Sequence, residues 1–326
     1  MPRGARERLG ARERQGSAVN VPLPGVRVGV VELPGPVIAA SGTAGHSDEL
    51  AAYVDLATIG AVVVKSMASF EWQGNPAPRL HAIDGGMINS VGLQGRGTRH
   101  WIEHDLARLT ARNARVVASI WGFRTGEYEA AARELAAVAD RLTAIEVNLS
   151  CPNLDHGRQM FAHDARQIAQ VIGAVRSAVP VSLPVWAKMS PNTDRLVDLC
   201  GVAVASGADA LVLANTVLGM RIDTASRRAV LGNGGGGVSG AAIHAVAVRC
   251  VFDVHRAHPQ VPIVGVGGVS CANDAIEMMM AGASAVQVGT ATFADPRATA
   301  KIQRAMLRWA RRHGVGSWGE ITGTAH

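Results

Sequence analysis

The chain has 326 residues, of which 48% are apolar and 4% aromatic, and its formal net charge is +6 at pH 7. This length fits one large domain or two ordinary ones, and the composition suits helices packed on a parallel sheet. No stretch approaches the roughly 20 uninterrupted apolar residues of a membrane span, and no N-terminal segment resembles a secretion signal. Four cysteines without a CxxC pair favour a reducing compartment and no structural metal. We therefore expect a cytoplasmic protein with no membrane partner and no metal site.

The positive charge is concentrated near the ends of the chain. The segment MPRGARERLGARERQG holds five arginines against two glutamates, which is half of the net charge. Such a run is typical of a solvated tail, and without interleaved aromatic residues it does not predict nucleic-acid binding. We expect residues 1–20 to be a disordered arginine-rich tail of unknown role and residues 21–326 to form one domain.

Short apolar runs recur along the chain, each followed by glycine or polar residues and then, in most cases, by a helical pattern. They are PVIAASG (36–42), AVVVKS (61–66), VVASIWG (116–122), AIEVNLS (144–150), PVWAKMS (184–190), ALVLANT (210–216), PIVGVGG (262–268) and AVQVGTA (285–291). Helical patterns cover 126–141, 164–178, 193–206 and 241–257. Continuous apolar strands alternating with helices indicate a parallel sheet buried on both faces. Eight units over about 250 residues fit a (β/α)8 TIM barrel better than an open doubly wound sheet. The preceding VRVGVVELPGP reads as an N-terminal hairpin that closes the barrel floor.

Active sites of such barrels lie at the C-terminal ends of the strands. The polar or glycine residues at those ends are Ser41, Lys65, Ser66, Ser119, Asn148, Lys188, Asn215, Thr216, Gly267, Gly268, Gly289 and Thr290. Cys151 follows the fourth strand, where the chain must turn. The other three cysteines lie in or beside amphipathic helical patterns and fit a packing role. We expect the strand-end residues and Cys151 to converge on one mouth.

The last two strands point to a phosphate group. GVGGVS follows the seventh and VGTATF the eighth, and loops at these positions commonly bind phosphate through backbone N–H groups. The glycine run GNGGGGVSG (232–240) adds a third loop of close approach, with a mobile lid as the alternative interpretation.

Two lysines at strand ends limit which ligand the site can hold. A lysine at the end of an apolar strand is costly to bury unless it meets a negative group. Few glutamates could pair with them, because Glu146, the one acidic residue well inside a strand, lies nearer its start. We therefore expect Lys188 to face an electron-accepting ring and Lys65 to bridge that ring and an anionic substrate. Flavin mononucleotide (FMN) meets both requirements.

Ten motifs in order resemble the class 1 dihydroorotate dehydrogenases, from about Val21 to Ala300. They are ASGTAG, VVVKS, GNPAPR, INSVGLQGRG, VNLSCPN, KMSPN, LANTVLGM, GGVSGAAI, VGVGGV and VGTA. SGT, GLQ, GGVSG and the phenylalanine of MFAHD resemble the B type. The resemblance departs at Ser119, where many relatives have asparagine, at Ala162, where glycine is common, and in the arginine-rich tail.

The resemblance implies a role for each matching residue. Cys151 matches the catalytic base. The residues that match substrate contacts are Lys65, Asn89, Ser90, Val91, Gly92, Leu93, Asn148, Asn153, Asn215 and Thr216. Those that match FMN contacts are Ser41, Lys65, Ser66, Ser119, Asn148, Lys188, Ala214, Gly240, Gly267, Gly268, Gly289 and Thr290.

The implied reaction oxidises (S)-dihydroorotate to orotate in de novo pyrimidine (UMP) biosynthesis. A hydride passes from C6 to FMN N5 and the C5 proton passes to Cys151. A thiol of pKa near 8.5 needs only a modest environment effect to act as a base near neutral pH. B-type enzymes pass electrons to NAD⁺ through a second subunit that carries FAD and a 2Fe–2S cluster. The resemblance thus implies a homodimer or a heterotetramer with that subunit.

Three alternatives stay open. A dihydropyrimidine dehydrogenase-like barrel also uses a loop cysteine, but such relatives tend to carry histidine where Asn153 stands. A tRNA dihydrouridine synthase-like enzyme pairs FMN with a cysteine beside proline, but needs an added helical domain. A phosphate-binding barrel without catalysis needs neither Cys151 nor both lysines.

Overall fold

The computed structural model describes residues 25–150 and 160–326, so the predicted tail at 1–20 lies outside the described residues. Eight parallel strands close into a barrel in the order β10-β15-β16-β3-β4-β7-β8-β9. Their bounds are β3 Val37–Ala39, β4 Val62–Val63, β7 Val116–Ile120, β8 Ala144–Asn148, β9 Val185–Lys188, β10 Ala210–Leu213, β15 Ile263–Val266 and β16 Ala285–Val288. The predicted (β/α)8 barrel and all eight of its strands are confirmed. The strands are shorter than the apolar runs, because the chain leaves the ladder at each C-terminal end to form a loop.

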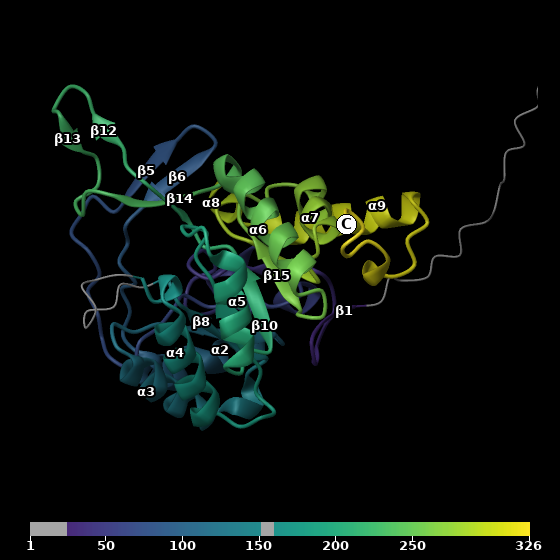
Figure 1. Ribbon diagram of the computed structural model, residues 1–326, viewed down its shortest axis with the longest axis horizontal. Coiled ribbons are helices and arrows are strands. Elements are labelled where there is room, and N and C mark those ends of the chain that lie inside the picture. The colour runs from purple at the N-terminus through teal and green to yellow at the C-terminus, as the bar shows by residue number, and fades with distance from the viewer. Residues whose placement is uncertain (1–24, 151–159) are drawn as a thin grey trace, which may run out of the picture.

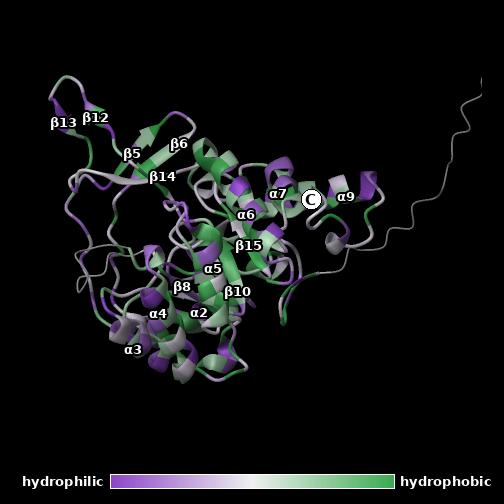
Figure 2. Ribbon diagram, viewed as in Figure 1, coloured by the Kyte–Doolittle hydropathy of each residue, from purple (hydrophilic) through white to green (hydrophobic). Residues whose placement is uncertain are grey.

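The barrel wall is buried on both faces and mostly apolar, with a few polar side chains inside the barrel. Every residue of these eight strands is buried, and Figure 2 shows β10 and β15 as largely hydrophobic among helices of mixed character. Burial on both faces explains why the strands are continuous apolar runs rather than alternating ones.

Helices surround the barrel (Figure 1). Their bounds are α1 Thr98–His104, α2 Leu106–Ala111, α3 Thr125–Ala136, α4 Ala165–Ala178, α5 Leu196–Ala205, α6 His244–Ala257, α7 Ala272–Met280, α8 Ala291–Ala294 and α9 Ala298–Arg312. The four predicted helices correspond to α3, α4, α5 and α6. At the start of α4, the side chain of Asp164 accepts a hydrogen bond from the backbone N–H of Gln167, which caps the helix. Across 25–150 and 160–326, no helix is both long and apolar enough to cross a membrane.

The predicted hairpin is also present, as β1 (Val26–Val28) paired antiparallel with β2 (Val31–Leu33). A Cβ at its tip, Gly29, would lie 3.5 Å from Pro262 and 3.6 Å from the carbonyl oxygen of Asp209. These two residues precede β15 and β10. The hairpin therefore covers the N-terminal end of the barrel, opposite the strand ends that form the site.

A second sheet stands at the other end. It consists of β5 (Leu80–Ile83), β6 (Gly86–Asn89), β11 (Val217–Gly219) and β14 (Gly236–Ser239), with a small hairpin of β12 (Ile222–Asp223) and β13 (Arg228–Ala229) beyond it (Figure 1). The glycine run at 232–240 is therefore not simply a loop, since four of its nine residues form strand β14. A Cβ at Gly237 would lie 2.1 Å from the Thr216 hydroxyl oxygen, so this strand requires glycine to pack against the barrel loops.

Candidate active site

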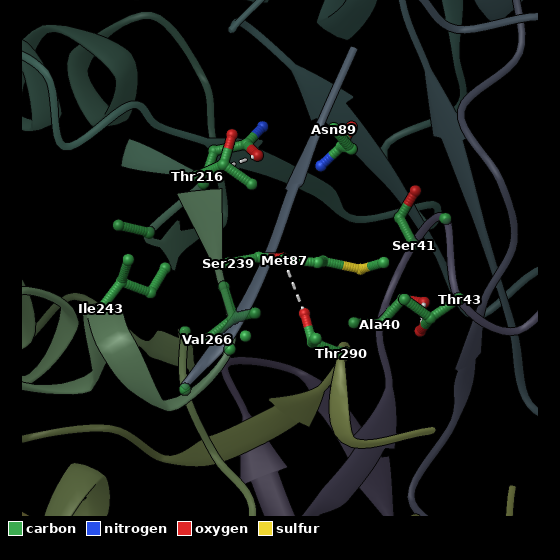
Figure 3. A pocket seen from close by; sticks show the side chains of 18 of the residues that line it. Ala40, Ser41, Thr43, Met87, Asn89, Thr216, Ser239, Ile243, Val266 and Thr290 are labelled. Atoms are coloured by element: carbon green, nitrogen blue, oxygen red, sulfur yellow. Dashed lines mark hydrogen bonds between the residues drawn. The ribbon is translucent and has the colours of Figure 1, made fainter. Parts of the chain in front are cut away.

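The C-terminal strand ends open into a cavity of about 540 Å³, within the range of small-molecule sites. Side chains from the barrel and from the second sheet point into it (Figure 3). The predicted residues that line it are Ser41, Lys65, Ser66, Asn89, Ser90, Val91, Gly92, Leu93, Asn148, Lys188, Ala214, Asn215, Thr216, Gly240, Gly267, Gly268, Gly289 and Thr290. Ser119 lies behind this wall, fully buried, and contacts it through Ser66.

Cys151 and Asn153 lie outside the described residues, so their predicted roles stay predictions. Burial raises the pKa of the Cys200 thiol, and it raises that of Cys250 to about 11. Both are therefore poor bases near neutral pH, in keeping with their predicted packing role. Among the described residues, no group of His, Cys, Asp or Glu side chains has the arrangement of a metal site.

The segment after β6 forms one wall of the cavity. Gly92 and Leu93 both have positive φ angles, of 76° and 62°. The Asn75 side-chain amide donates to the carbonyl oxygen of Ser90 at 3.1 Å, and a Cβ at Gly92 would lie 2.6 Å from the backbone nitrogen of Asn75. Glycine is thus required for the loop to close against Asn75. Asn89 is held separately, donating from Nδ2 to the carbonyl oxygen of Gly237 at 3.2 Å.

Two amide side chains meet at the ends of β8 and β10. Asn215 Nδ2 donates to Asn148 Oδ1 at 3.1 Å, and the backbone N–H of Thr216 donates to Asn215 Oδ1 at 2.8 Å. From below, the hydroxyl of buried Tyr128 donates to the carbonyl oxygen of Asn148 at 2.8 Å. The two amides therefore have fixed positions on the cavity wall before any ligand enters.

Beneath these amides lies a buried ion pair that the sequence analysis discounted. Lys188 Nζ lies 3.2 Å from Glu146 Oε1, with the lysine side chain 8% and the glutamate side chain 0% exposed. Ser119 donates to the same carboxylate at 3.2 Å, and Gln287 Nε2 donates to its other oxygen at 2.8 Å. The expectation that Glu146 lies too near the start of its strand to pair with Lys188 is therefore wrong. Glu146 does lie deeper in its strand, but the long lysine side chain reaches down one layer to meet it.

The opposite end of the cavity is shaped for close approach of a ligand to the backbone. Gly240, Gly267 and Gly268 all have positive φ angles. A Cβ at Gly268 would lie 2.6 Å from the Cβ of His244, and one at Gly240 would lie 2.6 Å from the Cα of Gly86. Figure 3 shows the Thr290 hydroxyl bonded to that of Ser239, at 2.8 Å. Hydroxyls and crowded glycine backbone thus meet where the sequence predicts a phosphate.

Lys65 lies at the end of β4 and lines the same cavity. His46 stands close enough that the positive charge of Lys65, after burial as the larger cause, lowers the pKa of its imidazole below the ordinary 6.5. Lys65 therefore brings a positive charge to this side of the cavity, which favours an anionic ligand, while His46 lies behind it outside the cavity lining.

The family follows from comparison with known proteins. The dihydroorotate dehydrogenase family model matches residues 25–309. The chain belongs to the dihydroorotate dehydrogenase family. It is thus an oxidoreductase.

Several curated relatives bear the name dihydroorotate dehydrogenase B (NAD(+)), catalytic subunit. The one from Desulforamulus reducens is 40% identical over 301 residues, covering 92% of this chain and 98% of the relative. That from Trichlorobacter lovleyi is 41% identical over 302 residues (93% and 98%), and that from Pelobacter propionicus is 42% identical over 298 (91% and 97%).

Glu146, Gln287, Asn192 and Ser239 are among the polar residues at this site that the sequence analysis missed. Glu146 was set aside, and Gln287 was not considered because it lies mid-strand. Asn192 donates to the carbonyl oxygen of Thr216 at 3.0 Å and accepts from the backbone N–H of Leu218 at 2.8 Å. Ser239 is the partner of Thr290. Two of these residues could have been identified from the sequence, since Asn192 lies in the motif KMSPN and Ser239 in the motif GGVSG.

Proposed function

We propose that this chain oxidises (S)-dihydroorotate to orotate in pyrimidine (UMP) biosynthesis, with FMN as its cofactor. The observation that carries the proposal is that one cavity gathers the paired amides Asn148 and Asn215, Lys65 and the phosphate-end glycines, in a chain of this family. The names of the relatives support the substrate.

The described residues fit FMN. The phosphate would lie at Gly267, Gly268, Gly289 and Thr290. At Gly267 and Gly268 a Cβ would clash with neighbouring side chains, and both residues have positive φ angles that favour glycine. Lys188, with 6% of the residue exposed, would lie under the ring at the barrel centre. FMN, when bound, supplies the acceptor for the hydride.

The protein residues then bind and deprotonate the substrate. Asn89, Asn148 and Asn215 offer amide donors and acceptors suited to the imide groups of a planar pyrimidine. Lys65 would neutralise its carboxylate. Cys151, and Asn153 beside it, lie on the segment after β8, and we assign the C5 proton to the Cys151 thiolate. The substrate loses a hydride and a proton, which together amount to two electrons and two protons.

A partner follows from the relatives' names, which specify a catalytic subunit and NAD⁺. We propose that electrons pass to NAD⁺ through a subunit with FAD and a 2Fe–2S cluster, in a heterotetramer built on a homodimer of this chain. Residues 21–326 would form the FMN-binding domain in that assembly.

The test is an anaerobic absorbance spectrum of the FMN-loaded chain before and after addition of L-dihydroorotate. Prompt bleaching of the flavin band with L-dihydroorotate but not with dihydrouracil supports the proposal. A flavin that stays oxidised contradicts it, and bleaching by dihydrouracil alone would favour the dihydropyrimidine alternative. Cys151→Ala is expected to bind FMN and orotate but to be reduced very slowly, whereas Cys271→Ala, which alters an exposed cysteine, is the matched control.

A further inference from the structure

A row of three serine hydroxyls connects the cavity wall to the buried carboxylate of Glu146. Ser41 and Ser66 lie 3.2 Å apart, Ser66 and Ser119 lie 2.9 Å apart, and Ser119 lies 3.2 Å from Glu146 Oε1. Ser66 is 3% exposed, and Ser119 and Glu146 are completely buried. The row is therefore shielded from bulk water over most of its length.

The carboxylate fixes the direction of every hydrogen bond in this row. Lys188 has only donors, so it holds Glu146 as an acceptor. Ser119 has one proton, which must go to Glu146, so Ser119 can only accept from Ser66. Ser66 has then given its own proton, and its oxygen must accept from its remaining neighbours.

One of those neighbours is a cavity amide. Asn148 Nδ2 lies 3.4 Å from the Ser66 oxygen. With that nitrogen turned toward Ser66, Asn148 Oδ1 faces the other way and accepts from Asn215 Nδ2 at 3.1 Å and from the backbone N–H of Ser150 at 3.2 Å. All the hydrogen bonds between the two cavity amides and Glu146 thus point the same way: Asn215 donates to Asn148, Asn148 to Ser66, Ser66 to Ser119, and Ser119 to the carboxylate.

We infer that Glu146 is a positioning residue for the pyrimidine. Its negative charge, acting through Ser119 and Ser66, makes the Ser66 oxygen an acceptor for Asn148 Nδ2. It thereby stabilises the donor and acceptor positions that the backbone N–H groups of Ser150 and Thr216 also favour in Asn148 and Asn215. This inference rests on the proposed function, because it assigns these two amides to dihydroorotate and orotate. Glu146 itself does not line the cavity, so its effect is indirect.

The test is a double-mutant cycle on orotate affinity. Glu146→Gln keeps the shape of the side chain and removes its charge, Ser119→Ala interrupts the row while leaving the ion pair, and Ser119→Thr keeps the hydroxyl as the conservative control. The dissociation constant of orotate is measured from the change it causes in the flavin absorbance of the FMN-loaded chain. Loss of one network hydrogen bond corresponds to about a 2- to 12-fold weaker affinity.

We expect Glu146→Gln and Ser119→Ala each to weaken orotate binding by this amount, the double variant to be no weaker than the worse single one, and Ser119→Thr to restore most of the affinity. Single effects that multiply in the double variant would overturn the inference, because Glu146 would then not act through Ser119. Lower melting temperatures with unchanged orotate affinity would overturn it too, since they would show a structural role alone. If Glu146→Gln does not fold, the difference in orotate affinity between Ser119→Ala and Ser119→Thr still tests the inference.

A second measurement separates this inference from the proposed function. The side-chain amide signals of Asn148 and Asn215 are followed by ¹H–¹⁵N spectra of the purified chain without orotate. Both signals are expected to shift in Ser119→Ala and to return toward the wild-type positions in Ser119→Thr, and unchanged signals would overturn the inference. A wild-type chain that fails to bind orotate would instead refute the proposed function, while the amide signals would still test the role of Glu146.

Discussion

The ion pair between Lys188 and Glu146 allows a quantitative test of how the barrel centre is stabilised. Lys188→Met keeps the length and most of the apolar stem of the side chain but removes its charge. Glu146 is 0% exposed, so it would be left as a buried charge without its cation. Breaking a buried pair in this way costs about 3–5 kcal/mol. Ser119 and Gln287 would still donate to the carboxylate, so we expect a value near the lower end, about 3 kcal/mol.

The assay is urea unfolding of the chain without FMN, followed by circular dichroism. The matched variant is Lys188→Met combined with Glu146→Gln, in which no charge remains to be buried. We expect the double variant to recover more than half of the free energy of unfolding that the single one loses, because the uncompensated charge causes most of that loss. A single variant that loses less than about 1 kcal/mol, or a double variant no more stable than Lys188→Met, would refute this reasoning.

Two further predictions concern the rim of the cavity. Gly268→Ala, whose Cβ would lie 2.6 Å from that of His244 at a φ of 73°, should weaken FMN binding by about tenfold, measured by quenching of FMN fluorescence. The control is Gly234→Ala, which has φ 82° but open space around it and should leave FMN affinity unchanged; equal affinities for both variants would contradict the crowding argument. For His46, burial and then Lys65 lower the pKa below 6.5, so the unfolded chain binds more protons and stability falls as pH drops through 6.5 toward the folded-state pKa. His46→Asn should lose less stability than wild type between about pH 7.5 and pH 5.5 in urea unfolding, and identical losses would show that His46 is not held neutral.

Much of this architecture could be predicted from the sequence, because buried parallel strands leave an unambiguous pattern. All eight strands are buried along their whole length and mostly apolar, since helices cover one face and the barrel interior the other. The cavity residues could be predicted for a related reason. A barrel brings every strand end to one mouth, so Ser41, Lys65, Asn148 and Lys188 could be placed together without knowing their distances.

The second sheet and its hairpin were not predicted. Strand β14 is made of Gly236, Gly237, Val238 and Ser239, a composition that local propensity assigns to a loop. It forms a strand because its backbone pairs with β6 and β11 and because only glycine fits against Thr216. Tertiary contacts outweigh the local preference there.

The partners of Glu146 show where sequence reasoning ends. Ser119 lies beside it in register on the neighbouring strand β7, and Lys188 follows on β9, on the other side. Gln287 belongs to β16, which is separated from β8 by three strands along the barrel wall, and it reaches the carboxylate across the interior. The sequence by itself determined that eight strands form and that polar residues end them. Which of those residues meet was decided only by the closure of the barrel, because closure sets the register of each strand and brings residues 141 positions apart within 2.8 Å of each other.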